Sequence, residues 1–164
     1  MKEQAARLLK EAEKLHERRL QSEKVGPDYF EPGMMEYLDK SEGIYEPTTG
    51  ELLLRFESRG TRYEGRSERI ERVRIGDTVR VIRDQANAFN HNNFLLFTDK
   101  GGDVGNMPAE LCNVIAPLYD NEDLTIRDAK VSYVEPLSSR SRYAKQAVLF
   151  VELRCVLDRY VTEN

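Results

Sequence analysis

The 164-residue sequence predicts a mainly β domain of the α+β class, with antiparallel strands packed against one helix. Three observations lead to this fold. Val79 and Val81 alternate with polar neighbours, which is the period of a half-buried strand. The turns between the expected strands are short, as in antiparallel sheets. Apolar residues recur at helical spacing from Ala109 to Tyr119, so this segment should form a helix that lies on the sheet.

The strands are expected in chain order, and most of them are separated by turn residues. They are placed at 44–45, 51–56, 78–82, 94–97, 129–134 and 147–153. The first two should form a hairpin around Pro47-Thr48-Thr49-Gly50. Residues 121–128 are predicted to be an acidic connection with a short strand.

A polar loop at 85–93 follows the strand at 78–82 and contains four Asn and one His in nine residues. Asn tolerates left-handed backbone conformations and hydrogen-bonds its own main chain, so a rigid, tightly wound loop is expected without Gly. After the next strand the chain should turn at 100–103 and again at Gly105–Asn106. Pro108 then suits the first turn of the helix.

These segments together resemble a known family. The motifs are Arg83-Asp84-x-x-Asn87-x-Phe89-Asn90-x-Asn92, an apolar strand, Gly102-x-Val104-Gly105-x-x-Pro108, a helix with Ala116-Pro117-Leu118, and an upstream Gly60–Arg66 that resembles an opening strand. Over residues 51–154 the chain resembles the HIRAN domain. The resemblance implies a small antiparallel β-barrel of oligonucleotide-binding-like or SH3-like type. HIRAN domains occur alone in bacteria and phages or attached to helicase-like ATPases and nucleases, and one grips the 3′ end of single-stranded DNA.

The resemblance also implies site residues, in a groove built from Arg62, Tyr63, Phe89, Asn90 and Gly105–Asn106. Tyr63 would stack on a base, Phe89 would pack at the groove wall, and Asn90 would meet the terminal sugar hydroxyl. In the 3′-end-binding relative, the position of Arg62 would be a tyrosine and that of Asn90 an aspartate. An amide is a weaker acceptor than a carboxylate, so recognition of a 3′ end stays open. So does the choice between DNA and RNA.

Two further groups complete the predicted nucleic-acid-binding set. His91 lies between Asn residues in the polar loop, where a loop-stabilising hydrogen bond is commoner than catalysis. Arg140, Arg142 and Tyr143 lie between the last two strands, where a hairpin tip can supply phosphate contacts and a stacking face. The alternative for this second group is a polar hairpin tip without a ligand.

The charge distribution favours a nucleic-acid role only in one region. The net charge is −4, which argues against strong nonspecific binding to a polyphosphate. Residues 51–84 are net positive, and all nine of their cations are Arg, which suits phosphate contacts and stacking. Arg66, Arg69 and Arg72 alternate with glutamates, so a solvated mixed-charge surface is the competing interpretation.

Several function classes find no support in the sequence. The two histidines lie near no nucleophile or carboxylate cluster, and there is no phosphate-binding Gly-Lys-Ser/Thr loop, so the chain is predicted not to be an enzyme. An ATPase or nuclease partner would therefore be a separate polypeptide. Cys112 and Cys155 lack zinc-site spacing and are expected as reduced core residues. We expect no cofactor, no metal, no membrane span and a cytoplasmic, bacterial protein.

The chain divides into four expected parts. Residues 1–24 form an amphipathic helix with an apolar stripe, residues 25–50 a connecting segment rich in Pro and aromatics, 51–156 the barrel, and 157–164 a tail. The helix would pack on the barrel or pair two copies as a homodimer. The predicted function is a module that binds single-stranded DNA or its 3′ ends, in DNA repair, replication or a mobile element. The alternatives are a protein-interaction module with a peptide-binding groove or dimer surface, and a barrel that has lost its ligand.

Overall fold

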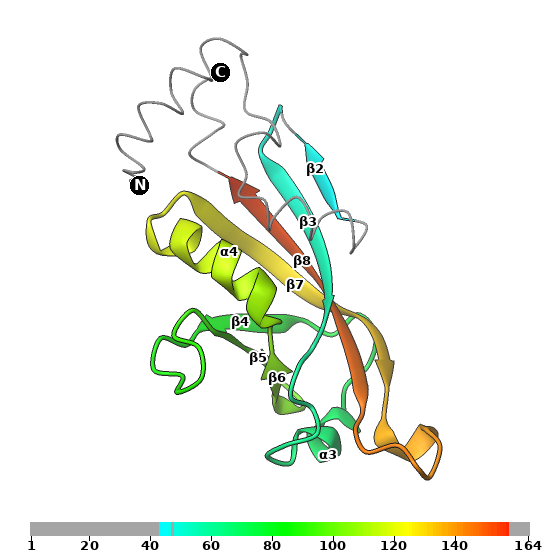
Figure 1. Cartoon of the computed structure of the whole chain (residues 1–164). Coiled ribbons are helices and arrows are strands. Elements are labelled where there is room, and N and C mark those ends of the chain that lie inside the picture. Colours follow the sequence, from blue (N-terminus) through cyan, green and yellow to red (C-terminus); the bar gives the residue numbers. More distant parts are fainter. Residues whose placement is uncertain (1–42, 47, 158–164) are drawn as a thin grey trace.

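The structure is a computed structural model that describes residues 43–46 and 48–157. Two antiparallel sheets make up the fold, one of four strands in the order β2-β3-β8-β7 and one of three in the order β4-β5-β6 (Figure 1). The predicted N-terminal helix, most of the connecting segment and the C-terminal tail lie outside the described residues, so these remain predictions.

The elements follow the chain in a simple order. They are β2 (Ile44–Glu46), β3 (Glu51–Glu57), α3 (Arg66–Ile70), β4 (Val79–Arg83), β5 (Phe94–Thr98), β6 (Gly102–Asn106), α4 (Ala109–Asp120), β7 (Leu124–Glu135), the 3-10 turn η2 (Leu137–Ser139) and β8 (Val148–Leu157). The hairpin of β2 and β3 is confirmed by its antiparallel pairing. The segment expected as an acidic connection supplies the first residues of β7, so that strand begins at Leu124.

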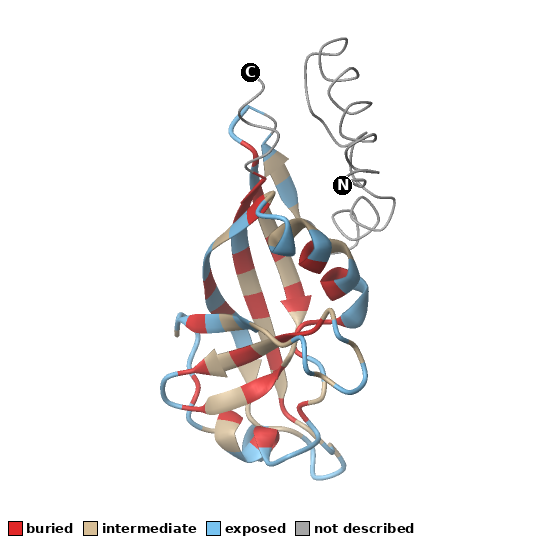
Figure 2. Cartoon of the chain, turned by 90° about the vertical axis from the view of Figure 1, so that its left-hand side faces the viewer, coloured by how far each residue is buried: buried red, intermediate tan, exposed pale blue. Residues whose placement is uncertain are grey.

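Alternation along the strands builds a core between the sheets. In β3, Leu52, Leu54 and Phe56 are buried, and the residues between them are half-buried. In β5, Phe94 and Leu96 are completely buried. Figure 2 shows the same alternation as red and paler bands along the strands. Burial of each such side chain stabilises the fold by about 1.5–3 kcal/mol relative to leaving it exposed.

Helix α4 confirms the predicted helix within one residue at each end. Pro108 occupies the N-cap with φ −58° and ψ 140°, where its missing N–H costs no hydrogen bond. Leu111 and Ile115 are completely buried, one turn apart on the face that meets the sheets. The opposite face, which includes Asn113, is exposed.

The expected closed barrel is wrong. The two sheets meet only at single bridges, Arg59 with Asn106 and Thr78 with Lys130, so no continuous ladder closes them. One cause is that β3 ends at Glu57, and the chain then turns away from the sheet at Gly60, which has a left-handed backbone with φ 78°. The result is two sheets that share one buried core and are joined at single bridges.

The expected opening strand at Gly60–Arg66 is also wrong. Gly60, Glu64 and Gly65 have φ angles of 78°, 55° and 73°, which make this segment a turn that leads into α3. The short helix was not predicted, because its charged sequence resembles a solvated surface.

The Gly105–Asn106 turn was likewise misplaced, since both residues belong to strand β6. Register shifts between Leu96 and Phe97 leave Val104 as an extra residue in a bulge. Gly105 has φ 129°, and a Cβ there would collide with Ser58 Oγ and lie 2.9 Å from the carbonyl oxygen of Arg59. The glycine therefore permits β6 to approach the end of β3.

Candidate nucleic-acid interface

The polar loop between β4 and β5 is wound by its own asparagine side chains. Asn87 Oδ1 accepts hydrogen bonds from the backbone N–H groups of Phe89, at 2.9 Å, and Asn90, at 3.0 Å. The loop is closed at its base by Asp84 N–H, which donates to the carbonyl of Asn93 at 2.9 Å. A tight loop is thus confirmed, but none of its residues has a positive φ, so the left-handed geometry expected of Asn is wrong. Asx-type hydrogen bonds wind it together with backbone hydrogen bonds, such as the one from Asn93 N–H to the carbonyl of Asn90 at 3.0 Å.

Asn90 uses both of its side-chain polar atoms inside the protein. Its Oδ1 accepts from the backbone N–H of Asn92 at 3.0 Å, and its Nδ2 donates to Asn113 Oδ1 at 3.2 Å. Asn92 Nδ2 donates to the same oxygen at 3.2 Å. Asn113, on α4, was not singled out from the sequence. Its position in the sequence is that of any polar residue on the outer face of a helix, so nothing local marks it as a site residue.

A buried amide joins the loop to β6. Asn93 is only 5% exposed, and its Nδ2 donates to Asp84 Oδ2 at 3.1 Å and to Asn106 Oδ1 at 2.9 Å. Both side-chain protons of Asn93 are therefore used. Because Asn106 turns its oxygen toward Asn93, its Nδ2 lies on the side of Gly60. The position of Asn106 is thus fixed from the loop side.

The turn that carries Arg62 and Tyr63 meets β6 at the same residue. Arg59 N–H donates to the Asn106 carbonyl at 2.8 Å, and Asn106 N–H donates back at 3.0 Å. Tyr63 is 60% exposed, and the Arg62 guanidinium lies 5.9 Å from the centre of its ring. The structure therefore places Arg62 and Tyr63 three and four residues beyond Arg59, on the turn that leaves the Arg59–Asn106 bridge. Asn93 ties the other side of Asn106 to the Asn90 loop.

Two arginines anchor this turn and are not free to bind a ligand. Arg66 is buried and makes a bidentate pair with Asp103, at 2.9 and 3.2 Å, while its Nη1 donates to the carbonyl of Gly60 at 3.2 Å. Arg69 Nε donates to the carbonyl of Asp103 at 2.8 Å. The sequence indicates that these arginines are phosphate ligands or a solvated surface, and neither interpretation predicts this structural role.

The first residue of the Asn-rich motif is also structural. Arg83 donates to both carboxylate oxygens of Asp120, at 3.0 and 2.9 Å, and to the carbonyl of His91 at 2.8 Å. Its guanidinium lies 5.4 Å from the ring centre of Phe94. The hydrogen bond to Asp120 raises the pKa of Arg83 above its usual value. The His91 carbonyl therefore helps to hold the loop, and its residue is exposed.

Phe89 stands apart from these contacts. It is 97% exposed, although the resemblance implies that it packs at a groove wall. Exposure of a phenyl ring to water is unfavourable, and a ligand or partner that covers the ring would remove this apolar surface from water.

The hairpin tip between β7 and β8 forms a separate group. Arg142 lies 5.0 Å from the ring centre of Tyr143 and donates to its hydroxyl at 2.9 Å, while Tyr143 is 74% exposed. Arg140 donates to the carbonyl of Gln146 at 2.8 Å and pairs with Glu135 at 3.5 Å. In Figure 1 this tip lies at the lower right and the Asn loop at the left, so the structure does not bring the tip and the Asn loop together.

The base of the tip is fastened to the end of α3. Ser138 donates from its backbone N–H and its hydroxyl to the two carboxylate oxygens of Glu71, at 3.0 and 2.7 Å. These hydrogen bonds lower the pKa of Glu71. The tip therefore has a fixed base even though its cationic end is exposed.

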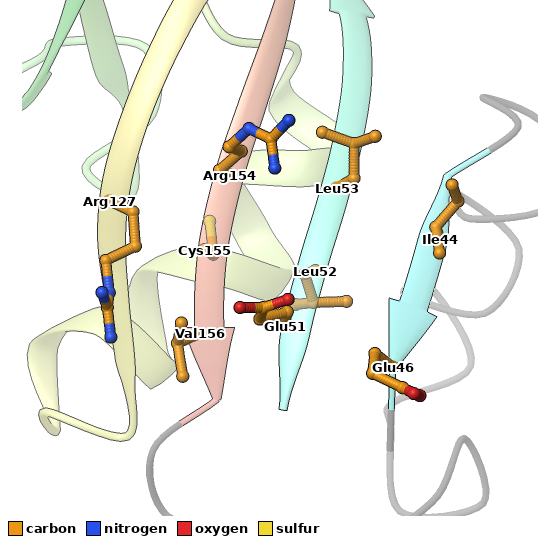
Figure 3. A pocket seen from close by; sticks show the side chains of 9 residues that line it. All are labelled: Ile44, Glu46, Glu51, Leu52, Leu53, Arg127, Arg154, Cys155 and Val156. Atoms are coloured by element: carbon orange, nitrogen blue, oxygen red, sulfur yellow. The ribbon is translucent and has the colours of Figure 1, made fainter. Parts of the chain in front are cut away.

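Two clefts lie away from the predicted groove. One, of about 220 Å³, is on the four-stranded sheet, and Figure 3 shows Leu53, Arg154 and Arg127 lining it from three neighbouring strands. The other is an open cleft between β4, the end of α4 and β7, which Arg83 and Gln85 help to line. Neither is lined by Tyr63, Phe89 or Asn90. Tyr63 and Phe89 are themselves exposed, so the candidate interface is a surface between loops.

Both cysteines are buried and unpaired, as the sequence predicts. Burial raises the pKa of Cys112 to about 11 and that of Cys155 to about 12, so neither is a reactive thiolate near neutral pH. Within 43–46 and 48–157, no three His, Cys, Asp or Glu residues gather where they could hold a metal ion. In the same part of the chain, no helix has the length and apolar character to cross a bilayer.

Comparison with known proteins decides the family. The HIRAN domain family model matches residues 52–152, which is more than half of the chain. The chain belongs to the HIRAN domain family. No curated protein matches it.

Solved structures with similar folds include two forms of one human HIRAN domain. The crystal structure of the HIRAN domain of human HLTF is 22% identical, with 62% of this chain and 74% of that chain covered and a TM-score of 0.44. The NMR structure of that domain in its DNA-bound conformation is 21% identical, with 63% and 75% covered and a TM-score of 0.42. A Lactobacillus plantarum protein is 16% identical, with 64% and 98% covered and a TM-score of 0.47.

Proposed function

We propose that this HIRAN domain binds single-stranded DNA at the surface between the 60–65 turn and the Asn loop. The observation that carries the proposal is the exposed Tyr63 with Arg62 beside it, on a turn that two buried or half-buried arginines hold in place. Membership of the HIRAN family supports it, as does the DNA-bound conformation of the human HIRAN domain. The biological setting we propose is DNA repair, replication or a mobile element, with any ATPase or nuclease on a separate polypeptide.

Stacking supplies most of the expected affinity. A base on an aromatic ring contributes about 1–3 kcal/mol, and Tyr63 and Phe89 each offer an exposed ring on one of the two segments. Arg62 can stack as a planar cation and contact a phosphate. Because Arg66, Arg69 and Arg83 are occupied within the protein, few cations remain for phosphates, and the salt dependence should be shallow.

Recognition of a 3′ end is the finer part of the proposal and concerns Asn90. Its Oδ1 accepts one hydrogen bond, from Asn92, and an amide oxygen has a second lone pair. A terminal 3′-hydroxyl can donate to that lone pair, whereas a 3′-phosphate cannot donate when ionised. Tighter binding of a free 3′ end than of a 3′-phosphorylated one is therefore expected.

A titration of labelled oligonucleotides at two salt concentrations tests the proposal. We expect a short single strand to bind with an affinity that falls modestly with salt, and a blunt duplex to bind more weakly. Equal affinity for free and phosphorylated 3′ ends would remove end recognition and leave strand binding in place. If no strand binds at either concentration, the nucleic-acid function is wrong.

One observation favours a second candidate, a protein-interaction module. Phe89, which is 97% exposed in a chain of net charge −4, can contact an apolar peptide residue as well as a base. This candidate predicts no binding of oligonucleotides in the same titration. Whether residues 1–24 pair two chains is a separate proposal, which light scattering of the chain with and without those residues tests.

A further inference from the structure

The hydrogen bonds around Asn90 determine which atom of Asn113 faces the solvent. A backbone N–H can only donate, so the bond from Asn92 N–H requires that Asn90 presents its oxygen there. The other end of the Asn90 amide is then its nitrogen, which must donate to Asn113. Asn113 therefore presents its oxygen to the loop, and the second donor, Asn92 Nδ2, reinforces that orientation.

This orientation leaves the Asn113 nitrogen pointing away from the loop. The residue is exposed on α4, and within the described part of the chain Nδ2 donates to no protein group. If the Asn113 amide were flipped, its NH2 group would face the donating NH2 groups of Asn90 and Asn92, with no acceptor between them. The loop therefore keeps Nδ2 of Asn113 directed toward the solvent. An oriented, unused donor beside Asn90 is a binding feature that needs no positive charge.

We propose that Asn113 is a ligand-contacting residue whose Nδ2 donates to an acceptor oxygen of the bound strand, on a phosphate or a base. The inference rests on the proposed strand-binding function and adds α4 to a surface so far assigned only to loops and β6. Asn106 supports it, because Asn93 orients that amide in the same sense, with its oxygen inward. The interface thus gains donors for an acceptor-rich ligand in a chain that is acidic overall.

If Asn113 had only a structural role, its side chain would need different hydrogen-bonding atoms from those that a ligand contact needs. The loop needs only an acceptor at this position, because Asn90 and Asn92 both donate to it. Aspartate supplies that acceptor with the same shape. Asn113→Asp therefore keeps the loop contacts while it removes the outward donor and places a negative charge against the strand.

The test measures oligonucleotide affinity and thermal unfolding for the full chain and for Asn113→Asp, with Asn121→Asp as the matched control. Asn121 is the exposed C-cap of α4, so its variant makes the same charge change on the same helix without altering the hydrogen bonds that Asn90 and Asn92 donate to Asn113. We expect Asn113→Asp to unfold at the same temperature as the unmutated chain and to bind a single strand at least about tenfold more weakly. Asn121→Asp should bind nearly as well as the unmutated chain.

The outcomes separate this inference from the function on which it rests. Unchanged affinity of Asn113→Asp, with the unmutated chain binding normally, overturns the role of Asn113 and leaves strand binding in place. Equal losses in both aspartate variants also overturn it, because the effect is then one of overall charge. No binding by the unmutated chain removes both. As a second readout, the side-chain NH2 signal of Asn113 in a nitrogen-15 spectrum should shift when the strand is added.

Discussion

Asp103→Asn should destabilise the protein much more than the loss of an exposed ion pair. Asp103 receives two hydrogen bonds from Arg66, whose side chain is only 7% exposed, and one from the backbone N–H of Gly105. The amide cannot accept both guanidinium bonds and leaves the buried Arg66 with only the exposed Glu64, 4.0 Å away, as a counter-charge. Removing one partner of a buried pair costs about 3–5 kcal/mol. Because Asp103 itself is 22% exposed, we expect about 2–4 kcal/mol.

The matched control is Glu110→Gln. The Arg59–Glu110 pair has a similar separation, 3.0 Å, but both side chains are 56% exposed, so its loss should cost less than about 1 kcal/mol. Urea unfolding of both variants measures the difference as a shift in midpoint at constant slope. If Asp103→Asn loses no more stability than Glu110→Gln, the buried pair does not hold the fold as argued.

The same variant reports on the interface. Arg66 also donates to the carbonyl of Gly60, at the start of the turn that carries Tyr63. If that anchor positions Tyr63, Asp103→Asn should weaken strand binding even at low temperature, where the variant is still folded. Full affinity in the folded variant would show that the turn holds its conformation without the ion pair.

Other predictions concern the core and the backbone. Gly105→Ala should cost more stability than Gly76→Ala in thermal unfolding, because both have positive φ but only Gly105 has atoms in the way of a Cβ; equal losses would contradict the close approach to Ser58. A thiol reagent should label Cys112 and Cys155 slowly in the folded chain and quickly in denaturant, and rapid labelling at pH 8 would contradict their burial. Because burial raises both thiol pKa values, the unfolded thiols ionise first, so stability should hold below about pH 9 and fall between about pH 9 and 12.

Periodicity predicted the parts of the fold whose burial is regular. The alternation around Val79 and the helical spacing of Leu111 and Ile115 correspond to elements with one buried face, which local sequence reports directly. The extent of β7 was not predictable in this way, because it follows from pairing with β8 along the whole strand. The junctions between the sheets were not predictable either, because they depend on single bridges between residues distant in sequence.

The misplaced segment at Gly60–Arg66 has a physical explanation. Gly60 and Gly65 were quoted only as parts of a family motif, and their positive φ angles turn the chain out of the sheet. Arg66 could not be recognised as a buried residue, since its partner Asp103 lies 37 residues away. A charged residue in a charged stretch carries no local sign of burial.

For the candidate site, the sequence identified side chains and the structure supplied their arrangement. Asn90 was expected to face a ligand, yet both its polar atoms bind within the loop and against α4. No local sequence pattern marks Asn113 as a site residue, because its role depends on the hydrogen bonds that it accepts from Asn90 and Asn92. The hairpin-tip residues Arg142 and Tyr143 were grouped with the groove by composition alone. The fold places the tip away from the Asn loop (Figure 1), and it joins the end of the tip to the 60–65 turn through a hydrogen bond from Thr61 to the carbonyl of Ala147.

The most direct test of strand binding at this surface compares Tyr63→Ala with Tyr133→Ala for affinity to a short labelled single strand. Both tyrosines are partly exposed, at 60% and 44%, but Tyr133 lies on β7, where it packs against Phe150. Loss of one stacked base, about 1–3 kcal/mol, predicts that Tyr63→Ala binds roughly ten- to a hundredfold more weakly with an unchanged salt slope. Tyr133→Ala should bind like the unmutated chain. Equal affinities for the two variants, whether both are full or both are reduced, would contradict a stacking role for Tyr63.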